Sequence, residues 1–166
     1  MKRLGLAVLM LATVLIQVTW APRVTLAGVF PNLALVAVIT VTWTAGVRPG
    51  MAAACIAGLM LDLTAPGPLG PHALALLAGA YLTGYWMRNL DRESVLHPVL
   101  AAAASTAVYS LILIATDDTL GLPLPPLAVA LQLVLAACVY NAMLMPPVVF
   151  AVRKLHARQT KRIEAA

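Results

Sequence analysis

Long apolar segments without charged residues are the feature that most restricts how this chain can fold. Residues 4–20 and 97–116 contain no Asp, Glu, Lys or Arg. Soluble domains carry about 25% charged residues, whereas this sequence carries 10%. A helix of about 20 apolar residues crosses the hydrocarbon core of a bilayer. The chain is therefore predicted to be an all-α protein that folds in a membrane.

Six apolar segments bounded by Pro, Gly and charged residues are predicted to be transmembrane helices. The third segment would be only about 21 Å long as a helix, so we expect it to end inside the protein. Residues 1–152 then form a single transmembrane domain, and 153–166 form a basic cytoplasmic tail. The six predicted helices are about 4–20, 29–45, 50–63, 71–87, 95–116 and 126–150.

The first segment also has features of a secretory signal peptide, because Lys2 and Arg3 precede a short apolar run. Thr19-Trp20-Ala21 offers small residues at the spacing of a cleavage site. Pro22 directly after this site disfavours processing. We therefore expect the segment to be retained as a helix.

The Lys and Arg residues are distributed unequally between the connections. If the chain crosses the bilayer six times from a cytoplasmic N-terminus, ten of its 11 basic residues are cytoplasmic and only Arg23 is external. Basic residues accumulate on the cytoplasmic side of membrane proteins. Both termini are thus predicted to be cytoplasmic in a multi-pass protein of the bacterial inner membrane. We interpret the net charge of +5 as a consequence of this orientation. The sequence shows no basic face suited to binding nucleic acid.

Small residues recur every fourth position in the third segment, at Gly50, Ala54 and Gly58, and the series ends at Asp62. This spacing places them on one stripe of a helix. Small residues let another helix approach closely in a bilayer, so the stripe is predicted to pack against a helix or bind a partner. Asp62 then either binds a ligand or partner, or caps the backbone N–H groups of the following turn, which is the interpretation we favour.

The turn after Asp62 is rich in Pro and Gly, which restrict its shape. It is predicted to be structural, with Pro66, Gly67, Pro68 and Gly70 as its defining residues. His72 follows at the start of the fourth segment. It is expected to be a hydrogen-bonded interface residue, although pairing with Asp62 as an acid–base couple is the alternative.

Polar residues inside the apolar segments are expected to form hydrogen bonds between helices. They are Gln17, Asn32, Gln132 and Asn141. No catalytic triad, zinc motif or phosphate-binding loop is recognised. The sequence therefore favours a non-enzymatic protein without a metal or cofactor.

Two groups of residues resemble the MreD family of rod shape-determining membrane proteins. The first is Phe30-Pro31-Asn32-Leu33. The second comprises Gly50, the run Gly58-Leu59-Met60-Leu61-Asp62-Leu63, Pro68-Leu69-Gly70 and Ala73-Leu74. The chain has Asn32 where the family usually has an acid. Gly58, Asp62 and Gly70 are the positions that match the family signature.

The resemblance implies a membrane scaffold of the cell-elongation machinery that regulates peptidoglycan synthesis. Its implied direct partner is MreC, through which it acts on RodA and a penicillin-binding transpeptidase, with a possible link to MreB filaments and contacts to membrane lipids. The family is also similar in fold to the S components of energy-coupling-factor transporters. This likeness implies the alternative function, a membrane subunit that binds a small vitamin-type solute.

Overall fold

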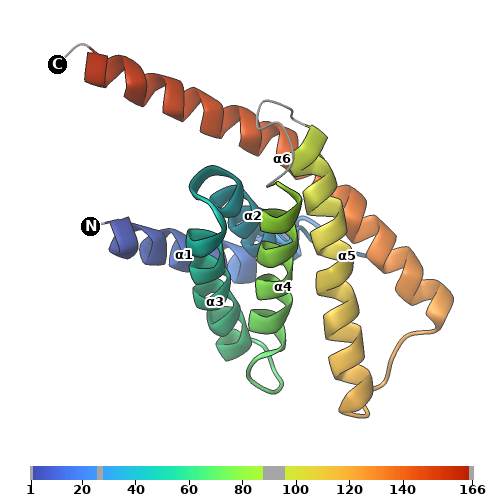
Figure 1. Ribbon diagram of the computed structural model, residues 1–166. Coiled ribbons are helices and arrows are strands. Elements are labelled where there is room, and N and C mark those ends of the chain that lie inside the picture. The colour runs from blue at the N-terminus through green and yellow to red at the C-terminus, as the bar shows by residue number, and fades with distance from the viewer. Residues whose placement is uncertain (1, 26–27, 88–95, 165–166) are drawn as a thin grey trace.

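A computed structural model describes residues 2–25, 28–87 and 96–164 (Figure 1). The described part has six α-helices, one 3-10 helix and no β-strand, which confirms the predicted all-α fold. The predicted connection at 88–94 and the last two residues of the predicted tail lie outside the described residues. The elements are α1 (Lys2–Thr19), η1 (Ala21–Arg23), α2 (Leu33–Ala45), α3 (Val47–Thr64), α4 (Pro71–Trp86), α5 (Leu96–Thr119) and α6 (Leu127–Glu164).

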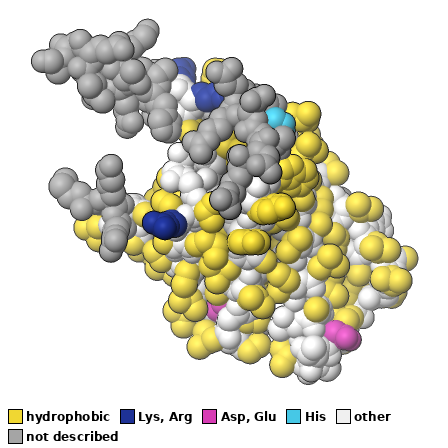
Figure 2. All heavy atoms as spheres, viewed as in Figure 1, with side chains coloured by type: hydrophobic (Ala, Val, Ile, Leu, Met, Phe, Trp, Pro, Cys, Tyr) yellow, Lys and Arg dark blue, Asp and Glu magenta, His cyan; other side chains and the backbone are white. Residues whose placement is uncertain are grey.

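Four helical stretches of the described part are long and apolar enough to cross a membrane. They are Leu4–Arg23, Val47–Thr64, Leu96–Thr119 and Leu127–Lys154. Neighbouring helices α3, α4 and α5 lie side by side, and both chain ends lie at the left of Figure 1. Hydrophobic side chains cover most of the face seen in Figure 2, with few charged groups between them. Such a surface suits contact with lipid.

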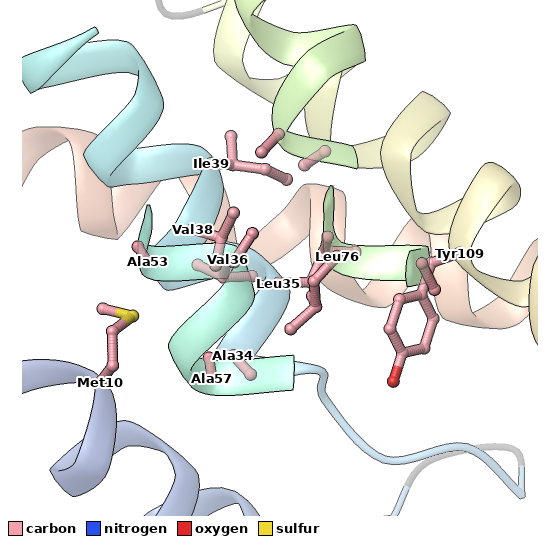
Figure 3. Close-up of a cluster of buried hydrophobic side chains, with 14 of the residues drawn as sticks. Met10, Ala34, Leu35, Val36, Val38, Ile39, Ala53, Ala57, Leu76 and Tyr109 are labelled. Carbon is pink, nitrogen blue, oxygen red and sulfur yellow. The ribbon is translucent and has the colours of Figure 1, made fainter. Parts of the chain in front are cut away.

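The centre of the fold is α2, which contacts each of the other five α-helices. Its side chains Leu35, Val38 and Ile39 are fully buried. In Figure 3 they lie in one cluster with Leu76 of α4, and Met10 of α1 points toward this core. A helix that is apolar all round belongs in a protein interior. Burial on several sides explains why apolar residues occur around most of the circumference of α2.

The third helix is longer than predicted. The predicted bounds of 50–63 are too short, because α3 has 18 residues and is long and apolar enough to be a candidate span. That it ends inside the protein stays a prediction. The prediction stopped at Pro49, but proline is tolerated in the first turn of a helix, where its missing N–H is not needed. Gly46, with φ of 98°, lies between α2 and α3 and reverses the chain there. The shortest α-helix of the described part is α2, which begins at Leu33 and not at the predicted residue 29.

The last helix also extends beyond its predicted end at 150. It continues without interruption to Glu164 and so includes most of the predicted tail. Its apolar part ends near Lys154. In Figure 1 its C-terminal half runs out beyond the other helices. Residues 153–164 therefore belong to the same helix as residues 127–152, and this helix, which contains Pro146 and Pro147, changes direction along its length in Figure 1.

Candidate functional site

The small-residue stripe of α3 packs against helices of the same chain. A Cβ atom on Gly50 would collide with Thr42 of α2, and one on Gly58 would lie 2.7 Å from the backbone nitrogen of Ala73 in α4. Ala54, between them, is fully buried. The predicted close approach of a helix is thus present, but the approaching helices are α2 and α4. A partner helix would have to displace one of them to use this stripe.

Asp62 holds the start of α4. Its side chain is 3% exposed, and its two carboxylate oxygens accept hydrogen bonds from the backbone N–H groups of His72, at 2.9 Å, and Ala73, at 3.1 Å. Gly70 at the N-cap has no side chain, and Pro71 has no N–H. The first available donors of α4 are therefore satisfied by an acid on α3, and a negative charge is favourable at a helix N-terminus. We expected Asp62 to accept hydrogen bonds from the N–H groups of the turn. The N–H groups that it binds belong instead to α4.

The turn itself reverses the chain between α3 and α4. Gly67 and Gly70 have φ of 148° and 121°, values that side chains rarely adopt. Pro66 and Pro68 are exposed. The turn lies at the lower end of the α3–α4 pair in Figure 1. Its glycines let Pro71 begin α4 immediately after the reversal.

The ring of His72 points toward α5. Its Nδ1 atom lies 2.6 Å from the hydroxyl group of Tyr109, whose ring is buried. Asp62 binds His72 through the backbone N–H alone, so the acid–base couple suggested by the sequence is not formed between these side chains. Tyr109 was not singled out from the sequence. A phenol inside an apolar segment was the available signal, because a buried hydroxyl group needs a partner.

Three amide side chains meet at the N-terminus of α2. Asn141 of α6 accepts from the N–H of Asn32 at 2.9 Å, Gln17 of α1 accepts from the N–H of Leu33 at 2.6 Å, and Asn32 itself accepts from Leu35 at 3.0 Å. Because α2 is short, its first N–H groups lie within the bundle and need acceptors. Hydrogen bonding between helices is thus confirmed for Gln17 and Asn141. Asn32 acts as the helix cap, a role that an amide performs as well as an acid.

The fourth predicted amide, Gln132, lies on the exposed surface of α6. Asn141, in contrast, also donates to Thr106 of α5 at 3.1 Å, and so connects three helices. Both residues occur in similar apolar surroundings in the sequence. Only the packing of α6 distinguishes the buried amide from the exposed one.

A cavity of about 450 Å³ lies beside this amide cluster. Its wall is formed by the end of α1, the segment before α2, the end of α3, the start of α4, α5 and α6. The sequence did not predict it, since residues from six separate parts of the chain enclose it. The residues that line it include Val18, Phe30, Leu61, His72, Tyr109, Leu113, Ala137 and Asn141.

A second cavity, of about 160 Å³, adjoins the first, and Ala65, His72 and Leu113 line both. Its other walls are more polar and include Asp62, Thr116 and Asp117. Within the described residues, no group of three or more His, Cys, Asp and Glu is placed to hold a metal ion. The two cavities together form the candidate site.

A model of one protein family, described as rod shape-determining protein MreD, matches residues 2–156. The match includes α1 to α5 and most of α6. A comparison with curated proteins and a comparison with solved structures found no match. The likeness to transporter S components therefore stays a prediction from the sequence.

Proposed function

The chain belongs to the MreD family of rod shape-determining proteins, and from this premise we propose that it is a non-enzymatic scaffold that binds MreC in the membrane. Through MreC it acts on RodA and the penicillin-binding transpeptidase during elongation of the cell wall. A role in rod-shape determination follows from membership of the family. The binding of MreC and the choice of surface are the proposal.

One observation carries the proposed mode of binding. Every fourth residue along the N-terminal half of α6 is a large apolar side chain that is exposed. The exposed fractions of Leu127, Leu131, Leu135, Val139 and Met143 are 75, 53, 65, 59 and 70%. This row is named here the α6 stripe. Residues four apart are neighbours on a helix surface, but each step turns by about 40° around the axis. The α6 stripe therefore winds around the helix as a ridge, and a single transmembrane helix can pack on about three consecutive members of it.

The α6 stripe replaces the small-residue stripe of α3 as the proposed partner surface. Gly50, Ala54, Gly58 and Asp62 are already covered by α2 and α4. In contrast, α6 packs mainly on α5, with a smaller contact to α2. We propose that Asp62 supports binding indirectly, by holding the α3–α4 pair together.

Cytoplasmic termini and a multi-pass position in the inner membrane belong to the same proposal. The four candidate spans and the distribution of Lys and Arg in the sequence support it. A link to MreB filaments would use the cytoplasmic end of α6, which extends past the apolar part of the helix.

Photocrosslinking in cells tests the proposal. A photoreactive amino acid is placed at Leu131, Leu135 or Val139, and at the buried α6 positions Met145 and Val149 as matched controls. We expect MreC in adducts from the exposed positions and not from the controls. A second series on the exposed face of α1, at Val8, Leu11 and Leu15, checks the other outer helix. Absence of MreC from every adduct of both helices would overturn the proposal.

The large cavity favours a second candidate function, capture of a small solute for transport. A solute site needs convergent polar groups, whereas Asn32, Asn141 and Thr106 in this wall bind one another. Thermal stabilisation of the purified protein by vitamin-type solutes would support this function. A melting temperature that is unchanged across such a panel would exclude those solutes as ligands.

A further inference from the structure

We propose that the large cavity holds one acyl chain of a membrane lipid, and that the adjoining acidic cavity receives the amine of its headgroup. The ligand class is a zwitterionic lipid with a primary ammonium group. This site lies apart from the α6 stripe. Its occupation does not depend on the binding of MreC.

The large cavity suits an apolar guest. Its volume of about 450 Å³ lies in the range of roughly 300–1,000 Å³ that is usual for small-molecule sites. Val18, Phe30, Leu61, Leu113 and Ala137 contribute apolar wall.

The polar side chains of the wall are engaged with one another. Asn141 binds the backbone of Asn32 and the hydroxyl group of Thr106, and Tyr109 binds His72. A guest therefore finds few free hydrogen-bonding groups. Its binding rests on contact with the apolar wall.

The position of the cavity gives access to lipid. Two of its walls come from the candidate spans Leu96–Thr119 and Leu127–Lys154, through Tyr109 on one and Ala137 on the other. Val18 and Phe30, which also line it, are 44 and 49% exposed, so the cavity opens to the surroundings at this edge. An acyl chain can enter from the bilayer through this opening without crossing water.

The charge of the smaller cavity selects the headgroup. Asp62 and Asp117 line it, and His72 and Leu113 connect it to the large cavity. Asp117 lies in the last turn of α5, where the helix dipole also favours a positive charge. The two oxygens of Asp62 already accept from His72 and Ala73 at the start of α4. The carboxylate of Asp117 and the C-terminus of α5 therefore favour an ammonium group and repel the net charge of an anionic lipid.

Native mass spectrometry of the full chain purified in mild detergent tests the acyl-chain site. The probes are phosphatidylethanolamine and phosphatidylglycerol with identical chains. We expect one retained phosphatidylethanolamine. Ala137→Phe and Ser110→Leu, which fill the cavity from α6 and α5, should lose it. Val139→Phe, on the exposed face of α6, should retain it, and thermal melting shows that each variant is folded.

The headgroup is tested by Asp117→Asn, which should abolish the preference for phosphatidylethanolamine while a lipid is still retained. Asp118→Asn is the matched control, because Asp118 is exposed and does not line the cavity. Unchanged lipid retention in folded Ala137→Phe and Ser110→Leu would overturn the acyl-chain site, and so would a wild-type chain that retains no lipid. A wild-type preference for phosphatidylglycerol would overturn the assignment of the headgroup.

Discussion

The carboxylate of Asp62 and the backbone N–H of His72 lie 2.9 Å apart, and this contact joins the end of α3 to the start of α4. The same carboxylate accepts from Ala73 through its other oxygen. Asp62 thus acts as an N-cap that is supplied by a neighbouring helix. It serves the donors that the Gly70-Pro71 sequence leaves without a local cap.

Replacement of Asp62 distinguishes capping from a need for charge. Asp62→Leu leaves two buried N–H groups without acceptors, at about 1–3 kcal/mol each, whereas Asp62→Asn keeps one carbonyl oxygen. Asp62→Leu should therefore lower the melting temperature in detergent more than Asp62→Asn, and Asp118→Leu at an exposed site should change it little. Equal losses in the two Asp62 variants would contradict the capping role.

A methyl group added at Gly58 should force α3 and α4 apart, since the new atom meets the backbone of Ala73. We expect Gly58→Ala to destabilise the fold by about 1–3 kcal/mol, as overpacking does elsewhere. Gly5→Ala is the matched control, because nothing lies within 4 Å of its added Cβ and alanine favours a helix. Thermal unfolding in detergent measures both. A Gly58→Ala melting temperature equal to that of the wild type would mean that the two helices separate freely.

Asn141→Leu preserves side-chain size but removes the acceptor for Asn32 and the donor to Thr106. Unpaired buried groups should reduce stability by roughly 1–3 kcal/mol. The same change at exposed Gln132 should be neutral. Parallel melting curves of the two variants report the difference, and overlap of the curves would show that the amide does not hold α6 to α2.

Tyr109→Phe removes the hydroxyl group that binds His72 and keeps the buried ring. The expected loss is about 1 kcal/mol. Tyr81→Phe serves as the control, since Tyr81 is 63% exposed. The chemical shifts of a labelled His72 ring should change in the first variant alone. Identical ring signals in both variants would argue against the contact.

The two termini should share one compartment. Epitope tags at each end should both react with antibody in inside-out vesicles and not in intact spheroplasts. This expectation follows from the positive-inside distribution of Lys and Arg. Tags that react on opposite sides would require an odd number of spans.

The sequence predicted the helices better than their contacts. Hydropathy located all six because both lipid and the interior of the bundle favour continuous apolar segments. The predicted third helix began only after Pro49, whereas α3 begins at Val47. A local sequence pattern does not show whether a proline lies in the first turn of a helix. The sequence identified Asp62, Asn32 and Asn141 as polar groups that need partners, but not which donors they meet.

No pattern in the sequence indicates the large cavity. Val18, Phe30, Leu113 and Ala137 are ordinary apolar residues in separate segments. They enclose a space only after α1, α5 and α6 have packed around α2. Sequence periodicity describes one helix at a time and therefore cannot reveal such a space.

The course of α6 has a mechanical consequence. A helix of 38 residues has about 57 Å of helical rise, and Pro146 and Pro147 in its interior bend it between its two halves (Figure 1). Its attachment to α2 by Asn141 lies before this bend. The part of α6 after Pro147 is thus held to the bundle separately from the part that Asn141 fixes.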